Sequence, residues 1–315
     1  MINRVSRTLI QAARFLVDGR PTANDMASSV PETLTKMKRQ HTYRREKDRI
    51  GAQGCIYCNG PAPLTLEHII PENIGGMLTI ERASCAFCAD ETGAFEGHAC
   101  LGMLPMRRQM RFPQKRRGAK DRERRKAERF VLMLDNNRVK VPIEEFPALL
   151  MSLVFPFPGI LLGQKPEDKP LTGGVYSAEL VEGFGEKLNR VKAKYRANSI
   201  GIMGIEPRKR GEEDDYGRML AKIGHSYATA ELGCGNFHPF LVHAIRGVKP
   251  YCLLFFIGSG LEKDSPLSND LREILLDDTV PGAEPFVVVK VRLFANRNTP
   301  THYIVVGQRI QQFSR

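Results

Sequence analysis

The sequence predicts an α+β fold in which a small cysteine-rich module is joined to a larger α+β domain. Three observations support this prediction. Two C-x-x-C pairs lie close together in the first third of the chain. A stretch dense in lysine and arginine follows them, and beyond it short β-like segments alternate with a strongly amphipathic helix. At 315 residues, the chain is long enough to bury two cores.

The amino-acid composition is that of a globular protein, but the charge is unevenly distributed. The chain is 42% hydrophobic and 26% charged, and its formal net charge is +12. Residues 1–50 contain eleven Lys/Arg against five Asp/Glu, and residues 107–129 contain twelve against three. A concentrated basic excess favours a polyanionic partner, because Lys and Arg displace counterions from nucleic acid; anionic lipid would attract it as well.

No segment is long and apolar enough to be expected to cross a membrane. The most apolar run, residues 149–163, is short and contains Pro156 and Pro158. Residues 1–17 have the spacing of an amphipathic helix and lack the continuous apolar core of a secretory signal, although they bear some likeness to a mitochondrial transit peptide. We therefore expect a cytoplasmic protein without a membrane partner.

Four segments are expected along the chain. Residues 1–50 form a basic, helical N-terminal segment whose second helix covers residues 32–48. Residues 51–105 form the cysteine module, and residues 106–129 form a basic arm, interpreted either as a solvated linker or as a phosphate-contacting element. Residues 130–315 form an α+β C-terminal domain of unknown role.

Local patterns predict the main elements of the C-terminal segment. A β-hairpin is expected over residues 131–141, with its turn at Asp135-Asn136-Asn137. Residues 215–232 have the spacing of an amphipathic helix, and Gly233 is expected to end it. Strands are expected over residues 251–257, 286–294 and 302–310, the last two joined as a hairpin.

The four paired cysteines have the spacing of a structural zinc site. The pairs are Cys55 with Cys58 and Cys85 with Cys88. Zn²⁺ binds four thiolates as a tetrahedron, and each C-x-x-C turn presents two thiolates to one side of the metal. A closed shell has no open coordination position, so the expected zinc holds the fold and indicates nothing about catalysis. The other three cysteines are scattered and are expected to be buried thiols.

The segment between the two pairs carries a more specific motif. It reads Leu64-Thr65-Leu66-Glu67-His68-Ile69-Ile70-Pro71-Glu72-Asn73-Ile74-Gly75-Gly76. An acid followed by His, two aliphatic residues, Pro and a Gly-Gly turn, flanked by C-x-x-C pairs, resembles the HNH endonuclease family. The resemblance covers residues 55–104 and is closest to members whose ββα-metal fold is held by a four-cysteine zinc site. It implies a ββα-metal (HNH) module that hydrolyses phosphodiester bonds in nucleic acid, with DNA favoured.

The resemblance also implies roles for individual residues. Glu67 would bind a catalytic Mg²⁺ or Mn²⁺, and His68 would be the general base that deprotonates the attacking water. In the family, the residue after the second C-x-x-C ligates the same ion. Here that residue is Ala89, which has no ligating atom, so Asp90 and Glu96 are the candidates for the missing ligand.

Three functions follow from these observations. The first is a metal-dependent HNH endonuclease, in which Arg107, Arg108 and Arg111 contact the phosphates beside the cleaved bond. The alternative is a zinc-stapled nucleic-acid-binding protein without nuclease activity, which the departure at Ala89 leaves open. The third is a zinc-folded adaptor whose C-terminal domain binds protein.

Overall fold

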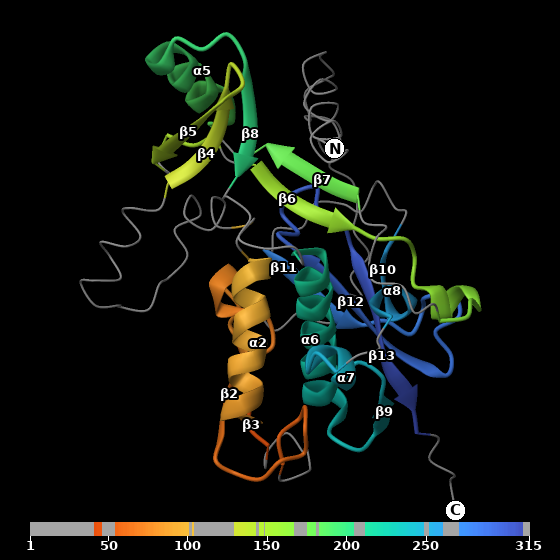
Figure 1. The fold of residues 1–315 in the computed structure, drawn as a ribbon. Helices are drawn as coiled ribbons and strands as arrows, with labels where there is room; N and C mark the ends of the chain where they lie inside the picture. The colour runs from red at the N-terminus through yellow and green to blue at the C-terminus, as the bar shows by residue number, and fades with distance from the viewer. Residues whose placement is uncertain are drawn as a thin grey trace, which may run out of the picture.

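The computed structural model describes residues 41–45, 54–100, 103, 129–142, 145–147, 149–166, 175–180, 183–204, 212–248, 252–260 and 271–310. The helix expected over residues 1–17 lies outside these ranges. So does the basic arm up to residue 128, which includes Arg107, Arg108 and Arg111. Within the described ranges the fold is a mixture of helices and sheets, as expected (Figure 1).

A three-stranded sheet carries the cysteine module. β2 (Leu64–His68) pairs antiparallel with one edge of β3 (Leu78–Cys85), and β1 (His41–Tyr43) pairs parallel with the other edge. The turn between β2 and β3 contains the short helix η1 (Glu72–Ile74), after which Gly75 has a φ of 80°. α2 (Ala86–Ala99) follows β3 without an intervening loop. The two strands β2 and β3 are thus followed directly by a helix, and the HNH identity of this module stays a prediction.

β1 corrects one expectation. The second basic helix was expected over residues 32–48, but residues 41–43 form a strand. In this strand Thr42 accepts a hydrogen bond from the Thr79 hydroxyl at 3.0 Å, and Tyr43 is buried. Pairing with β3 and burial of an aromatic ring therefore prevail over the helical pattern of the surrounding residues.

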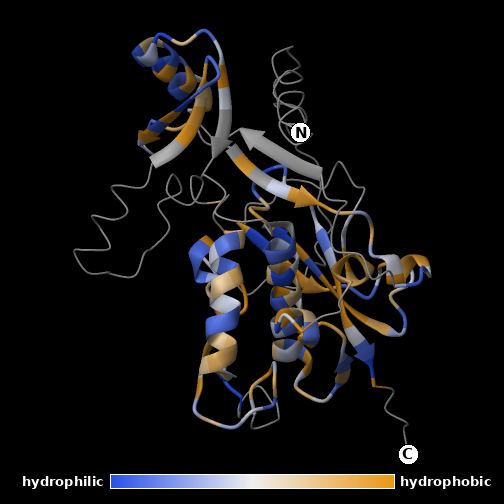
Figure 2. Ribbon diagram, in the orientation of Figure 1, coloured by the Kyte–Doolittle hydropathy of each residue, from blue (hydrophilic) through white to orange (hydrophobic). Residues whose placement is uncertain are grey.

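α6 (Glu212–Leu232) lies between α2 and a five-stranded sheet (Figure 1). Gly224 permits the close packing on this sheet, because a Cβ atom there would lie 2.7 Å from Ile304 Cγ2 and 2.9 Å from Val306 Cγ1. Hydrophobic residues, orange in Figure 2, run through the strands that α6 covers. The strands are, in spatial order, β10 (Ile257–Ser259), β13 (His302–Arg309), β12 (Phe286–Leu293) and β11 (Arg272–Leu276), with β9 (Phe237–Pro239) also paired to β13.

Most of the predicted C-terminal elements are confirmed. α6 covers the helix expected over residues 215–232, and Gly233 follows it with a φ of 89°. β12 and β13 form the expected antiparallel pair. β4 (Arg129–Leu134) and β5 (Asn137–Pro142) form the expected hairpin, in which Asp135 and Asn136 take the positive φ angles of 47° and 67° that such a tight turn requires.

The strand expected over residues 251–257 is largely wrong. Residues 253–256 form the helical turn α8 (Leu253–Phe256), and β10 begins only at Ile257. The turn lets the rings of Phe255 and Phe256 meet edge to face at 4.9 Å. It also brings Phe256 to 5.3 Å from the ring of Phe240. A short apolar run does not distinguish a strand from a helix, and aromatic packing decides between them here.

The remaining elements form two smaller units. β8 (Ile200–Gly204) pairs with β4 to complete a three-stranded sheet, whose order is β5, β4, β8. β6 (Leu149–Val154) and β7 (Val175–Leu180) form a separate antiparallel pair. Three further helices complete the described elements. Two are short, η3 (Gly159–Leu162) and α7 (Val242–Ile245), and the third is the longer α5 (Phe184–Tyr195).

The cysteine module and the C-terminal half share a hydrophobic core. Ile69 and Phe95 of the module belong to the same buried cluster as Met219 and Leu220 of α6 and Ile304 of β13. Among the described helices, none combines the length and the apolar character needed to cross a membrane. The division of the chain into four segments stays a prediction. One buried cluster includes residues of both the cysteine module and the C-terminal segment.

The C-terminal half contains a buried histidine. His302 on β13 is 1% exposed. Its Nε2 lies 3.1 Å from the hydroxyl of Tyr216, and its Nδ1 lies 3.1 Å from that of Ser259. Burial lowers the pKa of His302 to about 3, because the charged imidazolium would be removed from water.

We therefore expect the free energy of unfolding to decrease as the pH falls from about 6.5 towards 3. In that window the unfolded chain binds a proton on this imidazole and the folded chain does not. The contribution of His302 is about 2 kcal/mol between pH 7 and pH 5 by linkage. Urea unfolding at several pH values measures it. A His302→Gln variant with the same pH dependence as the wild type would contradict this origin.

Candidate functional site

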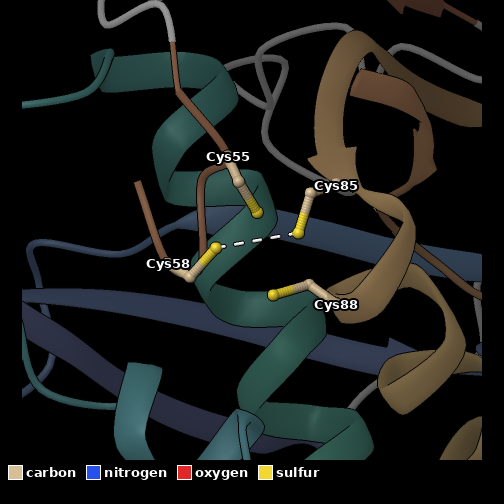
Figure 3. A group of neighbouring side chains, drawn as sticks. All are labelled: Cys55, Cys58, Cys85 and Cys88. Carbon is tan, nitrogen blue, oxygen red and sulfur yellow. Dashed lines mark hydrogen bonds between the residues drawn. The ribbon is translucent and has the colours of Figure 1, made fainter. Parts of the chain in front are cut away.

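The four cysteine sulfurs converge at one end of α2 (Figure 3). The Sγ atoms of Cys55, Cys58, Cys85 and Cys88 all lie within 4.8 Å of one another, and those of Cys58 and Cys85 are 3.7 Å apart. A tetrahedral zinc with Zn–S bonds of about 2.3 Å requires S···S separations of about 3.8 Å. The cluster therefore fits a Zn²⁺ ion, and the sequence-based expectation of a four-cysteine metal site agrees with the structure.

The local backbone conformation sets the positions of these thiols. In the first pair, the Asn59 N–H donates to the Cys55 carbonyl and the Cys55 N–H donates to that of Gly60, each at 2.8 Å. The Gly60 N–H points at Cys58 Sγ, 3.4 Å away. In the second pair, Cys85 ends β3 as the N-cap residue of α2, so both cysteines lie at a positive helix end. The first half of the site is thus set by a hydrogen-bonded turn and the second by the start of a helix.

The thiols differ in their readiness to ionise. Burial raises the pKa of Cys55 and of Cys88. At Cys85 burial also acts to raise the pKa, but hydrogen bonds from the Cys88 backbone and the neighbouring thiols lower it overall. Two buried thiols would stay protonated by themselves, so a cation in the shell is what makes four thiolates compatible with folding.

The first cysteine loop docks on α6. The Tyr57 hydroxyl and Ser226 Oγ are 2.8 Å apart, and His225 Nε2 lies 2.9 Å from the Ile56 carbonyl. Tyr57 is buried, which together with the charge of Glu67 raises its pKa well above the ordinary value. The four-cysteine cluster is therefore attached to the C-terminal half by buried polar contacts.

An irregularity between β2 and β3 decides where Glu67 points. Thr65 pairs with Ser84 and Glu67 pairs with Ile80, so β3 accommodates three residues opposite the single Leu66. Arg82 lies in this segment with a φ of 53°. Glu67 is 5% exposed, while His68, the next residue and the last of β2, is half-buried. Such a distortion is what adjacent strand residues need in order to serve one site.

The partner of Glu67 is a lysine from α6. Lys222 Nζ lies 2.6 Å from Glu67 Oε1 and 2.7 Å from Glu96 Oε1. The same ammonium donates a hydrogen bond to the carbonyl of His68. Lys222 is 1% exposed, so this is a buried ion cluster with one positive charge between two carboxyl groups.

The electrostatics of the cluster favour a charged lysine. Burial alone lowers the pKa of Lys222, but the charges of Glu67 and Glu96 and their hydrogen bonds raise it above its ordinary value. Burial raises the pKa of the Glu96 carboxyl, although Lys222 acts in the opposite direction. The ammonium is consequently the counter-charge that keeps these carboxyl groups in the interior.

The predicted ligands of a catalytic divalent ion are only partly brought together. Glu67 and Glu96 face one another across Lys222, whereas Asp90 is exposed on α2. Asp90 precedes Glu96 by six residues, which puts the two side chains about 120° apart around the helix. Within the described residues, carboxylates and imidazoles form no further group of three close ligands. The residues present do not fit a bound Mg²⁺ or Mn²⁺ while Lys222 is charged.

Sequence patterns alone missed Lys222. It lies on the same stripe of α6 as Asp215 and Arg218, and charged residues at helical spacing indicate a solvent-exposed face. In the structure this stripe is covered by α2. Arg218 stacks on the ring of Phe95 at 4.4 Å, and Asp215 lies 3.2 Å from His98 Nδ1. The helical spacing places these charges on one stripe, but it does not show which element covers that stripe.

We expect the protein to bind one zinc ion per chain and to lose it on Cys88→Ser substitution, because Cys88 supplies one of the four thiolates. Metal analysis by mass spectrometry measures the content. Cys252→Ser is the matched control, since Cys252 lies outside the cluster. Loss of the ion should lower the melting temperature by on the order of 10 °C. Equal zinc content in the two variants would exclude the four-cysteine site.

Comparison with known protein families, with curated proteins and with solved structures finds no match to this chain. A function can therefore be argued only from the residues and their arrangement.

Proposed function

We propose that this protein binds nucleic acid through a zinc-stapled module of HNH-like topology and does not use a catalytic divalent ion. The observation that carries the proposal is the ammonium of Lys222, held 2.6 Å from Glu67 and 2.7 Å from Glu96. Glu67 is the carboxylate that the resemblance assigns to the catalytic metal, and Glu96 is one of the two candidates for the ligand missing at Ala89. An internal cation at this place removes the need for a metal and the room for it.

Charge supports nucleic acid as the ligand. The net charge of +12 is more than accounted for by residues 1–50 and 107–129, which precede and follow the module along the chain. Phe87, between the two cysteines of the second pair, is 65% exposed and offers an aromatic face of the kind on which bases stack. Basic residues that contact phosphates and an exposed aromatic ring together suit a single- or double-stranded nucleic acid.

A second candidate function is the endonuclease that the sequence motif implies. His68 favours it, because its half-buried imidazole ends β2 and its backbone carbonyl is held by Lys222. His68 would accept a proton from water as the water oxygen bonds to phosphorus and the bond to the leaving oxygen breaks. Without a divalent ion, the charge on the departing oxygen would need another stabilising group.

The proposal predicts binding that depends steeply on salt. The affinity for a labelled duplex, followed by fluorescence anisotropy, should fall with a log–log slope of roughly −5 if about six phosphates are neutralised. Replacing Arg107, Arg108 and Arg111 by alanine should reduce this slope by up to about 3. His68→Ala should bind as the wild type does. Little affinity at low salt would instead favour an adaptor that binds protein.

Cleavage separates the two candidate functions. Supercoiled plasmid is incubated with zinc-loaded protein in Mg²⁺, in Mn²⁺ and in EDTA, beside the His68→Ala variant. We expect no strand breaks under any of these conditions, because Lys222 occupies the place of the metal. Nicking that disappears in His68→Ala would establish the endonuclease, and its response to EDTA would decide whether a metal takes part.

A further inference from the structure

Three oxygen atoms surround the ammonium of Lys222. Two belong to the carboxyl groups of Glu67 and Glu96, at 2.6 Å and 2.7 Å, and the third is the carbonyl oxygen of His68. They come from the end of β2 and the last turn of α2, while the lysine comes from α6. An ammonium has three N–H donors, so these three acceptors match its capacity.

The same three oxygens would suit a different cation. Hard divalent ions such as Mn²⁺, Mg²⁺ and Ca²⁺ bind carboxylate and backbone carbonyl oxygens at about 2.0–2.6 Å. Glu96 Oε1 is enclosed, and the ammonium of Lys222, 2.7 Å away, meets its charge. The three oxygens therefore suit an ammonium, and the Lys222 side chain stands where a metal ion and its waters would have to lie.

We infer that Glu67, Glu96 and the His68 carbonyl form a cation site whose resident cation is the side chain of Lys222, and that removing this side chain opens the site to a hard divalent ion. The chain thus carries its own counter-ion on α6. Lys222→Ala removes the positive charge and the four-carbon stem, which leaves two like charges and room for the waters that complete a metal's coordination.

The location of Lys222 explains why the native protein would exclude the ion. Arg218, one helical turn before it, is held by the carbonyls of Ala244 and Ile245 at 3.1 Å and 2.9 Å. Its guanidinium also covers the ring of Phe95. One turn after Lys222, Ser226 Oγ lies 2.8 Å from the Tyr57 hydroxyl, so contacts on both sides of the cluster hold α6 against the cysteine module and keep the ammonium between the carboxylates.

Binding of Mn²⁺ alone tests the inference. The electron paramagnetic resonance signal of free Mn²⁺ is followed during titration of zinc-loaded, full-length protein. Lys222→Ala should bind one Mn²⁺ at least about 10-fold more tightly than the wild type, as expected for a two-carboxylate oxygen site. Lys222→Ala/Glu67→Gln should lose this gain. Lys194→Ala is the matched control, because Lys194 pairs with Glu145 at 2.7 Å on the surface.

Equal Mn²⁺ affinity in the wild type and Lys222→Ala would overturn the inference. So would an equal gain in Lys194→Ala, which would indicate non-specific attraction. If Lys222→Ala is recovered only from inclusion bodies, its refolding yield with and without Mn²⁺ becomes the readout. A higher yield with Mn²⁺ supports the site, and equal yields contradict it. No nucleic acid is present in these measurements, so their outcome is independent of whether the proposed binding function holds.

Discussion

The buried ammonium of Lys222 joins three elements that are distant in the sequence. It reaches β2 and α2 from α6, and the separation between Lys222 and His68 is 154 residues. A buried pair of this kind contributes little net stability, but loss of one partner leaves an uncompensated charge in the interior and is strongly destabilising. The cluster therefore acts as a constraint on how the two halves fit together, since other relative positions would bury the carboxylates of Glu67 and Glu96 without a counter-charge.

α6 meets both halves of the molecule with different chemistry. Its polar stripe contacts the cysteine module through Arg218, Lys222 and Ser226, and the Tyr43 hydroxyl of β1 donates to Glu231 near its end. Its apolar side, with Gly224 at the closest approach, packs on β13. The four-cysteine cluster holds the loop that carries Tyr57, and α6 forms the wall on which that loop rests. The cysteine cluster and the contacts with α6 thus hold the same segment in place.

Two features reduce the capacity of the cysteine module for a divalent ion at Glu67. The two C-x-x-C pairs, the turn after Pro71 and the helix after Cys85 form a hairpin followed by a helix. At the position after the second C-x-x-C, Ala89 lacks a ligand, and Lys222 neutralises the carboxylates that remain. Both features act in the same direction, because each leaves fewer ligands for a divalent ion. They are the reason for proposing binding in preference to hydrolysis.

The sequence by itself determined the features that depend on neighbouring residues. The two C-x-x-C turns, the hairpin at Asp135 and the amphipathic spacing of α6 follow from local hydrogen bonds and periodicity. Only the tertiary structure decided that residues 41–43 form a strand, that residues 253–256 form a helical turn and that Lys222 is buried. Each outcome depends on a partner from another segment. The strand at residues 41–43 pairs with β3, the helical turn packs on Phe240, and Lys222 is buried against two glutamates. A charge on a helix stripe becomes a counter-ion only when another element covers it, and no local pattern records which element does so.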